Sequence, residues 1–202
     1  MPTLEIVQVG DPVLRARAHA VSREELASPE LQQLIADMRD TMRAAPGVGL
    51  AAPQIGRSLQ LAVIEDPPEY HAKMTPEERA ERERAAVPFH VIVNPVLTVV
   101  GDELVEHFEG CLSFAGFNMI VPRARHVRVE ALDEHGRPFV REASGWYARI
   151  LQHEIDHLYG IVCCDRMQSR TLTTAVNYSK HWGTRSIAET QAALDARSGR
   201  AR

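Results

Sequence analysis

The sequence predicts an α+β fold in which a largely antiparallel sheet packs with two amphipathic helices. Short apolar runs between residues 59 and 140 alternate with Gly, Asn-Pro and Gly-Asp turn signals, as expected for antiparallel strands. Two longer stretches, residues 28–43 and 144–160, instead repeat apolar residues at helical spacing. We expect the second helix in the concavity of the sheet and the first outside it.

The composition is that of an ordinary globular protein. The chain has 202 residues, of which 45% are hydrophobic and 25% charged, enough to bury a sizeable core. A net charge of −4 argues against general nucleic-acid binding, and no apolar run is long enough to cross a bilayer. The first residues lack the pattern of a secretory signal. Three cysteines, two of them adjacent, form a poor disulfide framework and suit a reducing compartment.

The first predicted helix begins at Ser28-Pro29, a cap residue followed by proline at the first helical position. Pro46 and Gly47 end it. Its apolar residues form one stripe that should cover the core: Leu31, Leu34, Ile35, Met38 and Met42.

A loop rich in small residues follows directly, with the sequence GVGLAAPQIG over residues 47–56. Its glycines indicate close backbone approach or positive φ. The loop follows a helix and lacks Lys-Ser/Thr, so it is neither a dinucleotide-binding fingerprint nor a phosphate loop. Gln54 is its one side chain with both donor and acceptor capacity.

A charged insertion over residues 66–89 separates strand-like runs. Thr75-Pro76-Glu77-Glu78 fits a capping box and predicts a solvent-exposed helix to about Ala86. The predicted strands and hairpin around it cover residues 59–65, 91–93, 97–100, 103–107, 121–131 and 139–140, and a short apolar strand covers residues 161–164.

Residues 144–160, SGWYARILQHEIDHLYG, carry the motif H-E-x-x-H. On a helix, His153 and His157 lie one turn apart on one face and can direct two imidazoles at one metal ion, with Glu154 close enough to handle a water there. Ser144 should be the N-cap of this helix and Gly160 its C′ residue. One continuous stripe along the helix is formed by Trp146, Ile150, His153 and His157.

An alternative interpretation makes the two histidines ordinary core residues. It does not explain Glu154 and Asp156 beside them, because carboxylates are rarely buried without a partner. The motif leaves the third ligand open. Cys111, within EGCLS at residues 109–113, is by itself most simply a small buried hydrophobe.

Together the three motifs GVGLAAPQIG, EGCLS and QHEIDH, in this order, resemble the peptide deformylase family over a span from about residue 10 to residue 167. The resemblance implies a deformylase-like fold and a hydrolase that removes the formyl group from N-formylmethionyl nascent peptides, releasing formate. It implies that Cys111, His153 and His157 bind one divalent metal, with Glu154 as general acid/base. In this family the metal is generally Fe²⁺, with Zn²⁺, Ni²⁺ or Co²⁺ able to replace it.

The resemblance also implies substrate contacts. Gln54, Gly49 and the backbone of Leu112 should contact the substrate, and Gln54 and the Leu112 N–H can stabilise charge on the formyl oxygen. We expect an apolar pocket for the methionine side chain, with three candidate residues: Val48, Trp146 and Ile150.

The chain departs from the common bacterial pattern after EGCLS. There the family usually has proline and then an arginine that contacts the peptide backbone, whereas this chain has FAGFN, with Asn118 in the arginine's place. The AGF segment, SGW at 144–146 and the insertion at 66–89 resemble the organellar branch. Leu112 matches the bacterial branch.

Two alternatives belong to other functional classes. A metzincin-like protease would place Cys163 where a third histidine belongs, but the residue type differs and no Met-turn follows. A non-catalytic metal-bound scaffold is the other, although every reacting group of a hydrolase is present.

The last part of the chain carries further expectations. We expect a catalytic domain over residues 1–168 and an extension over 169–202, with a terminal helix at 186–197. Residues 166–188 contain no acidic residue. A solvated tail is the simpler interpretation; the other is a ribosome contact made by Arg166, Arg170, Lys180 and Arg185. We expect a cytoplasmic protein, or an organellar one if a leader has been removed.

Overall fold

The computed structural model describes residues 3–72 and 74–197. The order of its elements is η1 (Pro12–Arg15), α1 (Arg23–Ala27), α2 (Pro29–Ala44), β1 (Gly49–Ala51), η2 (Ala52–Ile55), β2 (Leu61–Asp66), η3 (Pro68–His71), α3 (Pro76–Glu81), β3 (Val87–Glu109), β4 (Phe117–Leu132), β5 (Pro138–Ser144), α4 (Gly145–Leu158), α5 (Cys163–Arg166), η4 (Ser169–Thr171), β6 (Thr173–Thr174), α6 (Ala175–Asn177), η5 (Tyr178–Trp182) and α7 (Ile187–Arg197).

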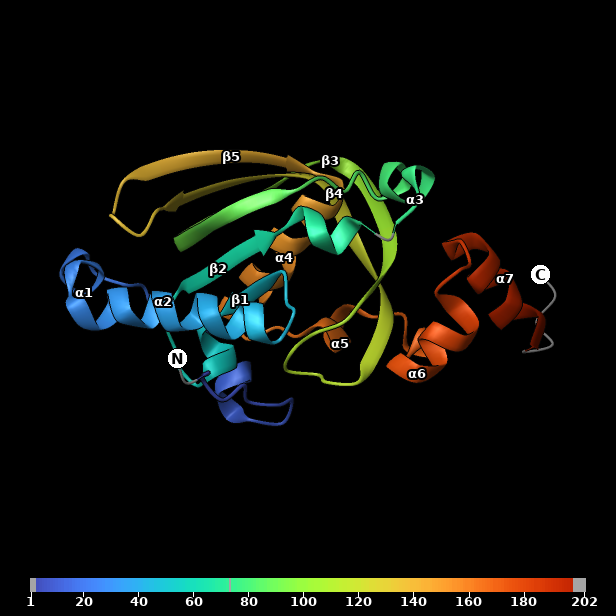
Figure 1. Cartoon of the computed structure of the whole chain (residues 1–202), viewed down its shortest axis with the longest axis horizontal. Helices are drawn as coiled ribbons and strands as arrows, with labels where there is room; N and C mark the ends of the chain where they lie inside the picture. Colours follow the sequence, from blue (N-terminus) through green and yellow to red (C-terminus); the bar gives the residue numbers. More distant parts are fainter. Residues whose placement is uncertain (1–2, 73, 198–202) are drawn as a thin grey trace.

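One antiparallel sheet organises these elements. Its strand order is β1-β2-β3-β4-β5, and the short β6 pairs with β4 outside this path. β3 and β4 form a long curved ribbon, and α2 and α4 pack on the sheet (Figure 1). The predicted α+β fold with a largely antiparallel sheet is confirmed.

The sheet is covered on both faces where the site forms. Along β2, Leu61 and Val63 are buried in the same cluster as the stripe of α2, while Ala62 and Ile64 are buried in the cluster of α4. Side chains alternate between the two faces of a strand, so the two clusters lie on opposite faces. The helix that carries H-E-x-x-H is therefore separated from α2 by the sheet, as expected.

Helix α2 has the predicted cap and stripe. The Ser28 hydroxyl accepts a hydrogen bond from Leu31 N at 3.2 Å, and Pro29 is the first helical residue. All five predicted apolar residues are buried. Each such side chain contributes about 1.5–3 kcal/mol through burial, which holds the helix on the sheet.

Strand β3 corrects the prediction of three separate strands. It is continuous over Val87–Glu109, and Asn94 and Gly101 take positive φ within it instead of forming hairpin turns. The register with β4 shifts between Val93 and Val96 and between Val100 and Leu104. Local turn signals can mark bulges as well as chain reversals, and here the bulges bend one strand around α4.

The helix within the charged insertion is shorter than predicted. The capping box of Thr75 and Glu78 is present, but α3 ends at Glu81, and Glu83 takes a positive φ of 46°. Arg84 donates to the buried Asp66 through two bonds of 2.8 Å. The run is thus tied to β2 and is more than the solvated face that its charges indicate.

Helix α4 begins and ends as the sequence predicts, with one difference. Ser144 occupies the N-cap position, but its side chain makes no capping bond. Gly160 has φ +74°, and the bonds Gly160 N to His157 O and Ile161 N to Asp156 O close a Schellman motif.

The predicted strand at residues 161–164 is wrong. Cys163 instead begins the short helix α5, because Val162 N donates to Asp165 Oδ2 at 2.9 Å and caps the turn. Four apolar residues could not distinguish a strand from a helical turn in advance.

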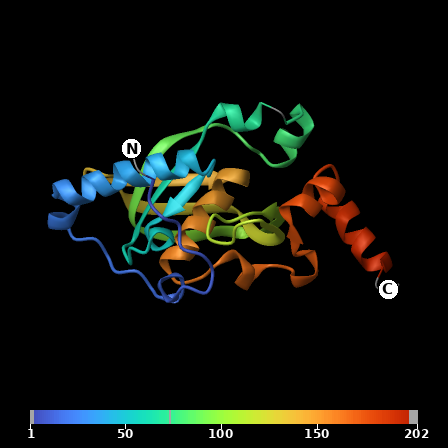
Figure 2. The same cartoon turned by 60° about the horizontal axis from the view of Figure 1, so that its bottom comes forward.

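The chain ends in helices beside the sheet. The predicted terminal helix is present as α7, and in both views α6 and α7 lie at the end of the molecule opposite α1 (Figures 1 and 2). Within residues 3–72 and 74–197, no helix is long and apolar enough to cross a membrane.

Gly160 generates a stability prediction. A Cβ there would lie 2.6 Å from Arg15 O, in addition to the strain of positive φ, so we expect Gly160→Ala to lower the free energy of unfolding by about 2–4 kcal/mol. Gly101→Ala is the matched control: its φ is +77°, and nothing lies within 4 Å of the added carbon. We expect a loss of about 1 kcal/mol there. Equal losses in urea unfolding of the two variants would contradict the close approach at Gly160.

Candidate metal centre and substrate cleft

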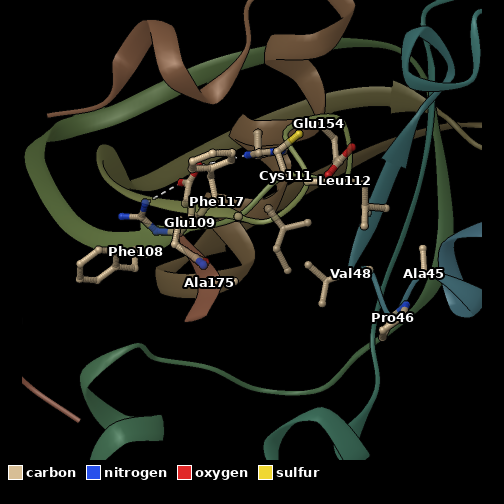
Figure 3. A pocket seen from close by; sticks show the side chains of 18 of the residues that line it. Ala45, Pro46, Val48, Phe108, Glu109, Cys111, Leu112, Phe117, Glu154 and Ala175 are labelled. Atoms are coloured by element: carbon tan, nitrogen blue, oxygen red, sulfur yellow. Dashed lines mark hydrogen bonds and ion pairs between the residues drawn. The ribbon is translucent and has the colours of Figure 1, made fainter. Parts of the chain in front are cut away.

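A cleft of about 690 Å³ opens where segments separated in the sequence meet. The predicted site residues on it come from the stretch between Ala45 and η2, from the stretch between the end of β3 and the start of β4, and from α4. Residues before β3 and after β6 complete the lining. Figure 3 shows Val48 and Pro46 on one side of this cleft, and Phe117 and Ala175 on the other. The predicted site residues that line it are Val48, Gly49, Gln54, Cys111, Leu112, Asn118, Trp146, Ile150, His153 and Glu154.

Three potential metal ligands converge at the inner end of the cleft. One ligand atom each from Cys111, His153 and His157 lie within 4.8 Å of one another. Cys111 Sγ is 3.4 Å from His157 Nε2, and the two imidazole ring centres are 5.0 Å apart. One thiolate and two imidazoles suit Zn²⁺, Fe²⁺ and related divalent ions. The donor set therefore fits the metal that the family resemblance implies.

Glu109, the first residue of EGCLS, orients His153. Its Oε2 lies 3.1 Å from His153 Nδ1, which directs Nε2 of the same ring toward the other ligands. Burial lowers the pKa of His153, but the hydrogen bond and charge of Glu109 outweigh it and raise the pKa to about 9. Burial would raise the pKa of Glu109, yet Arg123 and His153 hold it well below its usual range.

Arg123 is the centre of a buried ion cluster. It is 3% exposed and donates to both Glu109 oxygens at 2.9 and 3.0 Å and to Asp156 of α4. Arg149 Nη1 also donates to Glu109 Oε1, at 2.6 Å. The cluster joins the end of β3 to the metal helix.

Glu154 lies in the cleft without a complete set of partners. It is 4% exposed, and its Oε2 is buried with no hydrogen-bond partner among the described residues. Burial raises its pKa to about 7. Gly49 packs directly on the carboxylate, since a Cβ at Gly49 would overlap Glu154 Oε1. This position therefore requires glycine for space.

Gln54 and Leu112 supply N–H groups beside Cys111. Gln54 Oε1 accepts from Ala51 N at 2.8 Å, and Nε2 donates to Ser113 Oγ at 3.3 Å and to Cys111 Sγ at 3.6 Å. The Leu112 N–H makes no hydrogen bond within the described part of the chain. Leu112 is thus the unengaged donor, whereas Gln54 also braces the Cys111 sulfur.

The remaining predicted residues form the walls. Ile150 is buried, and Val48 and Trp146 are half-buried against the same cluster. Asn118 lies in β4 opposite Thr173 of β6. The predicted pocket residues thus share one cleft, although they come from three distant segments.

Cys163 occupies a different environment from Cys111. It is 2% exposed and packs in a cluster with Met119 and Val121, and Cys111 packs against the same cluster. Cys163 is not part of the group of potential metal ligands that Cys111 and the two histidines form within the described residues. The packing resembles that of an ordinary core cysteine.

The sequence interpretation missed several cleft residues. Glu109 stands in the EGC motif, and its acidic character beside a cysteine was the available signal. No sequence signal marks the other three as cleft residues, because a charged or aromatic side chain has many possible neighbours in a fold: Arg82, Arg149 and Phe108. Arg82 and Arg149 place their guanidinium carbons 5.4 and 5.9 Å from the ring centre of Trp146.

Comparison with known proteins gives consistent results. A sequence model described as polypeptide deformylase matches residues 3–172. Peptide deformylase 3 of Streptomyces avermitilis is 46% identical over 179 residues, covering 89% of this chain and 78% of that protein. The mitochondrial peptide deformylase of Homo sapiens is 45% identical over 172 residues, covering 85% of this chain and 71% of that protein. Both bacterial and organellar enzymes are therefore among its relatives.

A solved structure has the same fold. The class I type b peptide deformylase of Acinetobacter baumannii, bound to Met-Ala-Ser, superposes with a TM-score of 0.72 at 33% identity. The match covers 82% of this chain and 99% of that one. The family is metal-dependent and removes the N-formyl group from the N-terminal formylmethionine of new polypeptides. The motifs, the cleft and these matches show that the chain belongs to the polypeptide deformylase family.

Proposed function

We propose that Cys111, His153 and His157 hold the divalent ion of this deformylase and that Glu154 moves the protons of the reaction. The observation that carries the proposal is the convergence of the three ligand atoms, within 4.8 Å of one another, in the cleft that Glu154 lines. A divalent ion held there supplies Lewis-acid polarisation of the formyl carbonyl and lowers the pKa of a nearby water.

Glu154 performs both proton transfers. Its carboxylate takes a proton from the attacking water as the water oxygen bonds to the formyl carbon. When the C–N bond breaks, the same carboxyl group returns the proton to the leaving nitrogen. The products are formate and a free N-terminal amine. The buried Oε2, which no described residue satisfies, is the oxygen available for this work.

The growing charge on the formyl oxygen is stabilised by N–H donors. Leu112 offers a backbone N–H that is otherwise unused in the described chain. Gln54 offers an amide whose 3.6 Å contact with Cys111 Sγ is long enough for a developing oxyanion to compete with it. Removing such a donor typically lowers the rate by ~10² or more.

The substrate's methionine side chain lies among Val48, Trp146 and Ile150, which offer an apolar surface beside the reacting groups. Gly49 allows Glu154 to approach β1. Asn118, in place of an arginine, leaves the peptide backbone without a charged contact at that position.

Iron(II) is the ion that we expect in the cell, because the family resemblance implies it; Zn²⁺, Ni²⁺ and Co²⁺ are compatible with the same donors. We place the catalytic domain at residues 1–168 and an extension at 169–202. The compartment that we infer is the cytoplasm, a reducing environment that suits three free cysteines.

Contact with the ribosome surface is a further part of the proposal. Of the four cations expected to make it, Arg166 is engaged by Asp156 and Arg170 donates to Leu194 O. Lys180 and Arg185 are exposed on the C-terminal segment, where they can meet RNA phosphate.

Metal binding tests the ligand set. Cys111→Ser should lose most bound metal and nearly all formate release, because a neutral hydroxyl replaces a thiolate poorly. Cys163→Ser, the matched control, should keep both and lose only packing energy. Metal content is measured after anaerobic purification, which also identifies the ion. A metal-replete, active Cys111→Ser protein would overturn the assignment.

Proton transfer is tested separately at Glu154. Glu154→Gln preserves shape but cannot accept a proton, so we expect turnover of formyl-Met-Ala-Ser to fall by roughly 10² or more at unchanged metal content. His153→Ala serves as the metal-loss control. If Glu154→Gln lost as much metal as that control, Glu154 would be a ligand or a structural residue.

Ribosome contact is tested with Lys180→Gln/Arg185→Gln. Cosedimentation with ribosomes at low salt should weaken, while turnover of a free formyl-peptide stays unchanged, because these cations lie outside the metal centre. Arg23→Gln/Arg57→Gln changes the net charge equally at exposed positions elsewhere and should bind as the parent does. Equal cosedimentation of all three proteins would refute the contact.

A further inference from the structure

The C-terminal segment that follows Thr171 contributes to the substrate cleft. Ala175 of α6 and Tyr178 of η5 line the same cavity as Cys111 and Glu154. Both residues lie beyond residues 3–172, the part that matches the family. The cleft therefore has a wall that the matched domain does not supply.

This wall is held in place by contacts with the sheet. Thr173 and Thr174 of β6 pair with Asn118 and Phe117 at the start of β4. Ala175 N donates to Gly116 O at 2.8 Å. These backbone bonds fix the position of the chain, relative to β4, just before η5 begins.

The wall is aromatic on the side that faces the cleft. The Tyr178 ring lies 4.8 Å from the ring of Phe108, at an angle of 58°. Phe117 stacks on Phe114 with ring centres 5.1 Å apart and remains 39% exposed. Three rings that line the cleft thus leave apolar surface uncovered beside the metal centre: Phe108, Phe117 and Tyr178.

The two sides of the cleft determine which substrate residue meets this wall. Val48, part of the proposed methionine pocket, lies across the cleft from Phe117 and Ala175 (Figure 3). Successive side chains of an extended peptide point in opposite directions. When the methionine side chain points toward Val48, the next side chain points toward the rings.

We infer that Tyr178, with Phe108 and Phe117, forms a subsite for the side chain of the second substrate residue and favours aromatic or large apolar side chains there. This inference rests on the proposed chemistry at the Cys111, His153 and His157 centre. Tyr178 is a specificity residue in this scheme and takes no part in bond breaking.

The test compares formyl-Met-Phe-Ser with formyl-Met-Ala-Ser as substrates of the metal-loaded enzyme. An aromatic contact of ordinary strength should make the parent favour the phenylalanine peptide in kcat/KM by roughly twofold to tenfold, mainly through KM. Tyr178→Ala should lose most of this preference and retain turnover of the alanine peptide. Tyr178→Phe should keep the preference.

Trp182→Ala is the matched control. Trp182 lies on the same helix, stacks with Arg185 at 5.4 Å and does not line the cleft. We expect this variant to retain the parent's preference, which separates a subsite effect from loosening of the whole segment. An equal loss in Trp182→Ala, an unchanged preference in Tyr178→Ala, or a parent without preference would overturn the inference. A parent that releases no formate from either peptide would contradict the proposed chemistry as well.

Discussion

The buried guanidinium of Arg123 is the interaction on which the rest of the site depends. It joins Glu109, at the end of β3, to Asp156, inside α4, and both carboxylates are themselves buried. Removing one member of such a cluster leaves an uncompensated buried charge, at a cost of about 3–5 kcal/mol. The strand β3, which Cys111 follows, and the helix α4, which carries the two histidines, are therefore held together by protein contacts alone.

The same cluster links structure to chemistry through one carboxylate. Glu109 accepts from Arg123 and Arg149 and also meets His153 Nδ1, so the charge that completes the buried cluster also sets the orientation of a metal-binding ring. A ligand oriented in this way loses little conformational freedom when it binds. Rigidity at the metal centre and stability of the sheet–helix contact consequently have a common origin.

Sequence reasoning found those features that depend on short-range pattern. The α2 stripe and the Gly160 helix end follow from spacing and are confirmed. The roles of the eleven site residues, which come from spacing and the family motifs, stay predictions, although ten of the eleven line one cleft. Prediction from the sequence failed where contacts between residues far apart in the chain determine the local structure. Nothing local to Arg123 indicates that it faces two carboxylates, and the turn signals at Asn94 and Gly101 could not reveal that β4 runs alongside and keeps β3 continuous. The helical turn at Cys163 likewise depends on a side-chain cap within an apolar run.

The continuity of β3 also constrains how the length of this chain can vary. From Leu104 to Glu109 the strand is paired residue by residue with β4. Because side chains alternate between faces, deleting one residue here would turn Glu109 away from Arg123 and shift Cys111 out of step with the histidines. Deletions and insertions are therefore tolerated poorly in this stretch. A change of length between β2 and β3 would leave this β3–β4 register intact, because the paired residues that set it all follow Val87.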